Sequence, residues 1–351
     1  IPVSRTATVI RLPVCSFSKK ITRTYNVIII ASIIISKGTN FYVLIIGSLI
    51  ALISQVLFQL PAVKRTGFKY NLKVDFKDEN VKYLIILILP VLIGGGVEQV
   101  NTLIDGTLAS TFGEGVVTSF NYANRLYGFV SSIFVVSILS VVYPIMAKTS
   151  AAEDTKAFKI SIKKTLNIIL MFIIPICVGT LVLSGPIVKL LFERGKFNES
   201  DTIMTANILM VYIISILAFS LRNVISRAFY SLHDTKTPMI NGAIAIVFNI
   251  VLNIVLSKYM GYIGLAIATT IAAYIGLVIF LVTLRKRIGS FDGKSILATA
   301  IKSIISAAIM GIATSICYNQ LANVLGVGLI SQVIHLGLSI LVGVVVYAMS
   351  I

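Results

Sequence analysis

Polar side chains that could form one binding site interrupt two neighbouring apolar stretches of this sequence. Glu98, Asn101 and Asp105 are three and four residues apart, so an α-helix places them on one face. Arg125 follows in the next apolar stretch. Counted from a turn near Phe112, Glu98 and Arg125 lie roughly 20 Å along their helices and therefore at similar depth. Charges are costly inside a membrane, so a cluster at that depth indicates a functional site.

We expect Glu98, Asn101 and Asp105 to line a cavity that Arg125 enters, with Glu98 holding the guanidinium when cargo is absent. A guanidinium presents a planar set of donors that matches anionic oxygens, so the site suits an anionic cargo. The alternative is that Arg125 ends the apolar stretch Leu126–Ala147 and extends to the membrane interface. Loss of activity in both Arg125→Ala and Arg125→Lys would favour the binding site.

A second unusual feature is a run of residues that loosen a helix backbone within the stretch that carries Glu98. The run consists of Pro90 and the triplet Gly94, Gly95 and Gly96. Bending at membrane depth occurs where a cavity can satisfy the freed backbone groups, which predicts a hinge that gates the cavity. The alternative is close packing between helices through small residues.

Further candidates lie later in the chain. Arg222 could contact cargo at the inner mouth of the cavity, whereas Arg227, nearer the cytoplasmic end of the same helix, is expected to extend to lipid headgroups. Asn249 and Asn253, at positions i and i+4, predict a packing face that forms hydrogen bonds across helices. No acidic pair suited to Mg²⁺ and no phosphate-cradling glycine motif occurs in the sequence, so we expect no metal, no cofactor and no enzyme site.

The composition is that of a membrane protein. Of 351 residues, 57% are hydrophobic and 12% are charged, which is about half the charged fraction of soluble domains. Long apolar runs without strand alternation predict an all-α polytopic bundle of about ten transmembrane helices. The net charge of +17 comes largely from basic residues clustered in alternate loops. That pattern places both chain ends in the cytoplasm and accounts for the charge without nucleic-acid binding.

The apolar runs and the loops between them predict five segments. These are an irregular cytoplasmic stub at 1–24, the last two helices of a truncated N-terminal lobe at 25–63, a cytoplasmic linker at 64–82, a six-helix C-terminal lobe at 83–287 and a transmembrane hairpin at 288–351. Within the lobe, Ser184, Gly185 and Pro186 are expected to break a helix. The short apolar run after the stub suggests that upstream helices are missing.

Four stretches, taken in order, resemble the MurJ/MviN family of lipid II flippases, part of the MOP superfamily that includes multidrug exporters. They are VEQVNTLID at 97–105, ANRLYGF at 123–129, ERGKF at 193–197 and RAFYSLHDTKTPM at 227–239. The last is the most specific. The resemblance runs from about residue 25 to the end of the chain.

This resemblance implies a bacterial plasma-membrane transporter of the MOP/MATE-like fold. It implies alternating access between two lobes, which carries undecaprenyl-diphosphate-linked peptidoglycan precursor (lipid II) from the inner to the outer leaflet for cell wall biogenesis and cell shape. Arg125 is implied to help bind the diphosphate within a cationic cavity, and Asn124 of the same motif is a further candidate substrate-binding residue. The final hairpin is implied to form a groove for the lipid tail. Because the family's first helices are not matched, we expect this chain alone not to replace a depleted flippase.

Two other functions are compatible with the sequence. A related exporter of drugs or other lipid-linked oligosaccharides would share the architecture, although the 227–239 stretch favours the first interpretation. A membrane-embedded glycosyl- or prenyltransferase is the third, and labelled product formed from a lipid-diphosphate donor would support it. The driving ion and the oligomeric state do not follow from the sequence.

Overall fold

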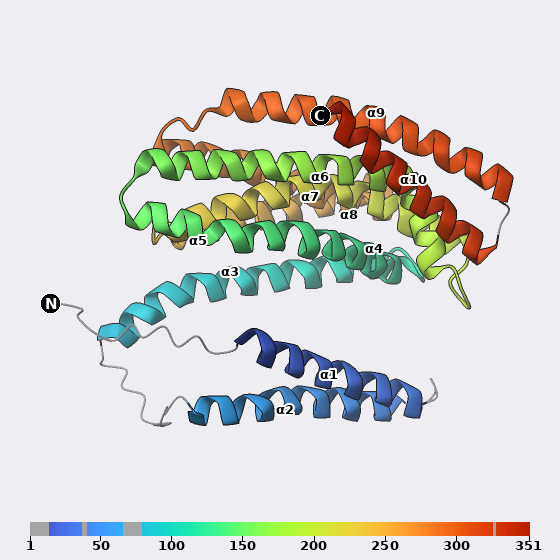
Figure 1. Ribbon diagram of the computed structural model, residues 1–351, viewed down its shortest axis with the longest axis horizontal. Coiled ribbons are helices and arrows are strands. Elements are labelled where there is room, and N and C mark those ends of the chain that lie inside the picture. The colour runs from blue at the N-terminus through green and yellow to red at the C-terminus, as the bar shows by residue number, and fades with distance from the viewer. Residues whose placement is uncertain (1–13, 37–40, 66–78, 326–327) are drawn as a thin grey trace. The chain divides into compact units, whose positions relative to one another are not determined.

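The computed structural model describes residues 14–36, 41–65, 79–325 and 328–351 (Figure 1). Its helices are α1 (Val14–Ser36), α2 (Phe41–Arg65), α3 (Glu79–Ser110), α4 (Val116–Val130), the π-helical η1 (Ser131–Val136), α5 (Ser137–Ala151), α6 (Thr155–Phe192), α7 (Glu199–Ser231), α8 (Lys236–Ile288), α9 (Gly293–Leu325) and α10 (Leu329–Ser350). The all-α prediction is confirmed.

Length and hydropathy identify membrane spans. Among the described residues, seven helices are long and apolar enough to cross a membrane. Large apolar side chains on their outer faces are exposed, for example Val247, Val278 and Ile304, as expected of surfaces that meet lipid. The chain is therefore a multi-pass membrane protein.

The longest helix, α8, is two spans joined at a glycine. Its 53 residues would reach roughly 80 Å if straight, more than twice the hydrocarbon thickness. Gly261 interrupts the helix with φ +60°, a conformation that glycine adopts without steric cost. The two halves then run back past each other so closely that a Cβ on Gly264 would collide with the Leu256 carbonyl group.

The chain divides into two compact units, one ending at Asp78 and the other beginning at Glu79. In the first, α1 and α2 pack together, and Gly47 lies directly against the Ser32 side chain. The second holds α3, the continuous segment α4–η1–α5, α6, α7 and the two halves of α8, followed by α9 and α10. The six-helix lobe expected at 83–287 stays a prediction. Most of the linker expected at 64–82 lies outside the described residues.

The segment expected to be irregular up to residue 24 differs from the structure. Helix α1 begins at Val14, so its first turns fall inside that segment. The apolar residues Val14, Phe17, Ile21, Tyr25 and Ile28 recur every three or four positions, which is the spacing of one helix face. Basic and hydroxyl residues between them obscured this pattern. Residues 1–13 lie outside the described part of the chain.

The expected break at Ser184–Pro186 is wrong. Helix α6 runs without interruption to Phe192, with Pro186 inside it. Proline removes one backbone hydrogen bond, but the residues around it are held by packing. Leu183 and Ser184 are buried, and Val188 lies fully buried in the cluster formed with α4 and α7.

The C-terminal hairpin packs on the lobe. Helices α9 and α10 contact each other and α6 (Figure 1). The Tyr347 hydroxyl group donates to the Met171 carbonyl oxygen at 2.7 Å, and Gly343 lies directly against the Thr314 side chain. Before α9, Asp292 forms an ion pair with Lys163 of α6 at 2.5 Å. The hydrogen bond from Lys163 lowers the pKa of the Asp292 carboxyl group below its ordinary value.

Candidate functional site

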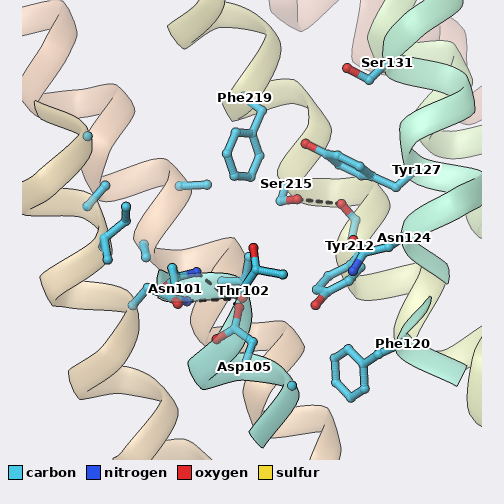
Figure 2. Close-up of a pocket in the computed structure, with 18 of the residues that line it drawn as sticks. Asn101, Thr102, Asp105, Phe120, Asn124, Tyr127, Ser131, Tyr212, Ser215 and Phe219 are labelled. Carbon is cyan, nitrogen blue, oxygen red and sulfur yellow. Dashed lines mark hydrogen bonds between the residues drawn. The ribbon is translucent and has the colours of Figure 1, made fainter. Parts of the chain in front are cut away.

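A cavity of 520 Å³ lies between α3, α4, α7 and α8 (Figure 2). This volume is within the range of small-molecule sites, roughly 300–1,000 Å³. Four of the predicted site residues line it, namely Asn101, Asp105, Asn124 and Arg222. Helix α3 supplies the first two because Asn101 and Asp105 are one helical turn apart, as the sequence predicts.

Hydrogen bonds join the α3 and α8 walls of this cavity. The two oxygens of Asp105 accept from Asn101 at 3.2 Å and from Asn253 at 2.6 Å. Asn253 also donates to Asn249 at 3.1 Å, and Asn249 donates to the Thr269 hydroxyl group at 3.1 Å. Asn249 and Asn253 are buried, so the expected packing face with hydrogen bonds across helices is confirmed. The amide donors stabilise a carboxyl group that would be costly alone at this depth.

Arg222 brings a cation to the α7 side of the cavity, one turn beyond Phe219. Its Nη2 donates to the Asn241 oxygen at 3.2 Å, and Asn241 in turn donates to the Gly276 carbonyl oxygen at 3.0 Å. The guanidinium also lies 5.8 Å from the Phe219 ring centroid. Asn241 belongs to the first half of α8 and Gly276 to the second. These two hydrogen bonds therefore fix the position of the Arg222 guanidinium relative to both halves of α8.

Helix α4 faces the cavity with Asn121, Asn124, Tyr127 and the first η1 residue, Ser131. These positions recur every three or four residues and so share one face. Arg125 is exposed and does not line the cavity, which differs from the expected arrangement. The part of α4 that lines the cavity includes Phe120, Asn121, Asn124 and Tyr127, and Arg125 lies outside it.

Aromatic rings connect α4 to α7 along the cavity. Phe120 meets Tyr212 edge to face at 5.8 Å, Tyr212 meets Tyr127 at 6.4 Å, and Tyr127 meets Phe219 at 6.0 Å. Figure 2 shows Phe120 near Asp105 at one end of the cavity and Phe219 near the other. Edge-to-face contacts hold aromatic rings in fixed orientations, so this part of the wall is stiff.

The other predicted residues lie elsewhere in α3. The side chain of Glu98 is outside the described part of the structure, so its pairing with Arg125 stays a prediction. The backbone is helical through Pro90 and Gly94–Gly96. Among described residues, nothing approaches within 4 Å of a Cβ built on Gly96, so helix packing does not require a glycine there.

Sequence reasoning missed the aromatic wall and the amides that accompany it. Tyr127, Phe219, Asn121 and Asn223 line the cavity, but none is unusual by residue type. One signal was available in the sequence. An asparagine and an aromatic residue are three or four positions apart on each helix, Asn124 with Tyr127 and Asn223 with Phe219, and therefore share a face. Which spans lie side by side was not available from spacing.

Comparison with known proteins bears on this architecture. The family model "Lipid II flippase MurJ" matches residues 18–336. A "Probable lipid II flippase MurJ" from Vibrio cholerae is 33% identical over 234 residues, covering 67% of this chain and 45% of the relative. The protein of the same name from Rickettsia prowazekii is 30% identical over 310 residues, covering 86% of this chain and 60% of the relative. The chain thus spans about half the length of these relatives.

Solved structures of membrane transporters also resemble this chain. The inward closed conformation of a lipid II flippase MurJ superposes with a TM-score of 0.70 at 28% identity, covering 93% of this chain and 64% of that one. An outward-facing MATE transporter of the MOP superfamily reaches 0.52 at 17% identity over 75% of this chain, which shows a shared fold. Seven apolar helices and bacterial relatives of this kind identify a multi-pass protein of the bacterial inner membrane. Since the match runs from residue 18 to residue 336, the chain belongs to the MurJ family of lipid II flippases.

Proposed function

We propose that this chain forms part of a lipid II flippase, a transporter rather than an enzyme. It would move undecaprenyl-diphosphate-linked peptidoglycan precursor from the inner to the outer leaflet by alternating access. The main support is the family match over residues 18–336, which includes every helix that lines the cavity. A polar cavity inside an apolar bundle supports it too, because a polar headgroup needs such a route across lipid. Likeness to MATE transporters at 17% identity concerns the fold and gives no support to drug export.

In this proposal the diphosphate binds Arg125, outside the lobe cavity. The side chain is exposed next to Asn124, which lines the cavity, so a cargo held by Arg125 lies at the cavity edge. Arg222 would contact cargo at the inner mouth, and the α9–α10 hairpin would hold the lipid tail. Pro90 and Gly94–Gly96 would let α3 bend as the lobe closes on cargo. This is compatible with Gly96, since no described residue lies within 4 Å of a Cβ at that position.

Arg125 is expected to dominate binding of the anionic cargo. In nanodiscs of neutral lipid, Arg125→Ala should weaken binding of lipid II to the chain by about tenfold or more, the effect of losing one charge-assisted contact. Arg125→Lys should recover only part of the affinity, since an ammonium lacks the planar fork. Arg194→Ala is the matched control, because Arg194 is exposed in the α6–α7 turn and bonds the Leu191 carbonyl oxygen. Undiminished binding in Arg125→Ala would remove this residue from the site, and failure of the unaltered chain to bind would contradict the proposed function.

We propose further that both chain ends are cytoplasmic. The basic residues in the first turns of α6 and in the last turn of α8 lie at the same end of the lobe, because Lys163 of α6 pairs with Asp292, which follows α8. That clustering of positive charge is typical of the cytoplasmic side.

Two exposed residues near the ends of one span test this orientation. Glu114 lies between α3 and α4, and Lys156 lies at the start of α6, at opposite ends of one span. A membrane-impermeant maleimide added to intact cells should label the Glu114→Cys protein and leave the Lys156→Cys protein unlabelled until the membrane is opened. The reverse pattern would invert the topology. The unsubstituted chain is the control, because it shows how much label reacts with the native cysteines.

A further inference from the structure

The two walls of the lobe cavity differ in how their polar groups are used. On the α3–α8 wall, Asp105 is bonded by Asn101 and Asn253. On the α4–α7 wall, Asn121 and Asn124 are exposed, and among the described residues neither side chain forms a hydrogen bond to the protein. The α3–α8 wall therefore holds the lobe together, whereas the α4–α7 wall presents amides that a ligand can use.

Amides and aromatic rings lie close together along the α4–α7 wall. Asn121, Asn124 and Tyr127 follow one another on α4, and Phe219 and Asn223 lie one turn apart on α7. A ligand on this wall meets hydrogen-bonding groups and flat apolar surface within a few ångströms of each other.

The rings are fixed, yet part of their surface is open. Tyr127 and Phe219 are half-buried and meet at an interplanar angle of 77°. Behind them Phe120 and Tyr212 are buried, with 8% and 6% of their surface exposed. A ligand that stacks on the front rings therefore does not have to order them, which lowers the entropic cost of binding.

The charges of this cavity lie at its ends. Among the described residues that line it, Asp105 is the acidic side chain and Arg222 the basic one. Each is already bonded, Asp105 to two amides and Arg222 to Asn241. The surface between them is neutral, so it offers no excess of positive charge to a diphosphate.

A pyranose ring that carries an acetamido group matches such a surface. Its axial C–H bonds form an apolar face that packs on an aromatic ring, and its hydroxyl and amide groups exchange hydrogen bonds with asparagine. We propose that the α4–α7 wall is a binding subsite for the uncharged, acetamido-bearing sugar of the cargo, separate from the site of the diphosphate. This inference rests on the proposed function.

The relation between Asn124 and Arg125 fits a sugar joined directly to a diphosphate. The two residues are adjacent on α4, one facing the cavity and the other exposed beside it. An anionic group held by Arg125 leaves its attached sugar next to Asn124 and one turn from Tyr127. The wall thus selects the headgroup, while the cation anchors it.

Two lipids that differ only in the sugar test this subsite. The chain in neutral nanodiscs is titrated with undecaprenyl diphosphate and with the same lipid carrying an N-acetylated disaccharide. The unaltered chain should bind the glycosylated lipid about tenfold more tightly, which corresponds to one ring contact and one or two hydrogen bonds. Asn124→Leu and Tyr127→Leu should each bring the ratio of the two affinities close to one.

Phe129→Leu is the matched control, because Phe129 lies on α4 with 64% of its surface exposed and does not line the cavity. It should keep the ratio of the unaltered chain. Equal affinity of that chain for the two lipids would overturn the subsite and leave the proposed function standing, whereas binding of neither lipid would overturn both. If Tyr127→Leu weakened the binding of both lipids by the same factor, Tyr127 would only support the fold, and the subsite would be overturned.

Discussion

Asn253→Leu is expected to destabilise the lobe by about 3 kcal/mol, because it leaves a carboxyl group at membrane depth without its shortest hydrogen bond. Asn253 is fully buried, and its amide donates to Asp105 at 2.6 Å and to Asn249 at 3.1 Å. Leucine keeps the branching at Cγ and is the larger side chain, so the loss does not come from a cavity. The free energy of unfolding in detergent, followed by circular dichroism, measures it.

A double-mutant cycle identifies the cause. When Asp105→Leu has removed the carboxyl group, the further change Asn253→Leu should cost clearly less than it does alone, because only an amide partner remains to lose. Asn319→Leu is the control, since Asn319 is exposed near the end of α9, and it should stay within about 0.5 kcal/mol of the unaltered chain. Equal costs of Asn253→Leu in both backgrounds would show that Asp105 is not the group it stabilises.

The fold could be predicted largely from the apolar runs and from the glycine, proline and charged residues that separate them. Both halves of α8 follow from such runs, and Gly261 falls in the gap between them. The break expected at Pro186 shows the limit of this reasoning. Whether a proline ends a helix depends on how firmly the turns on either side are packed, and Val188 is buried against helices distant in sequence.

The site was predictable only within single helices. Spacing places Asn101 and Asp105 on one face, and the structure agrees. Asp105 and Asn253 are separated by 148 residues, and no spacing rule relates them. Spacing also fails to say which side of α4 turns inward. Neighbouring helices decide that rotation, and the ring contacts of Tyr127 with α7 turn Asn124 into the cavity and Arg125 out of it.

Gly276 sets the position of the cation that does lie in the cavity. A Cβ built on Gly276 would lie 3.1 Å from the Arg222 Cζ and 3.0 Å from the Ala245 Cβ. The Ala245 Cβ is fixed to a helix backbone, so a side chain at 276 must push the guanidinium. Gly276→Val is therefore expected to cost about 2–3 kcal/mol of unfolding free energy, as overpacking of a close contact does.

Truncating the neighbour should relieve much of that cost. In an Arg222→Ala background the guanidinium is gone and only the Ala245 contact opposes the new side chain, so Gly276→Val should cost at least 1 kcal/mol less there (about half the overpacking energy). Gly337→Val is the control, because nothing described lies within 4 Å of a Cβ at Gly337. Additive costs at Gly276 and Arg222 would mean that the two residues do not contend for the same space. A smaller cost of Gly276→Val in the Arg222→Ala background would mean that the absence of a side chain at Gly276 leaves the space that the Arg222 guanidinium occupies. Arg222 can then bond Asn241 at one end of the cavity.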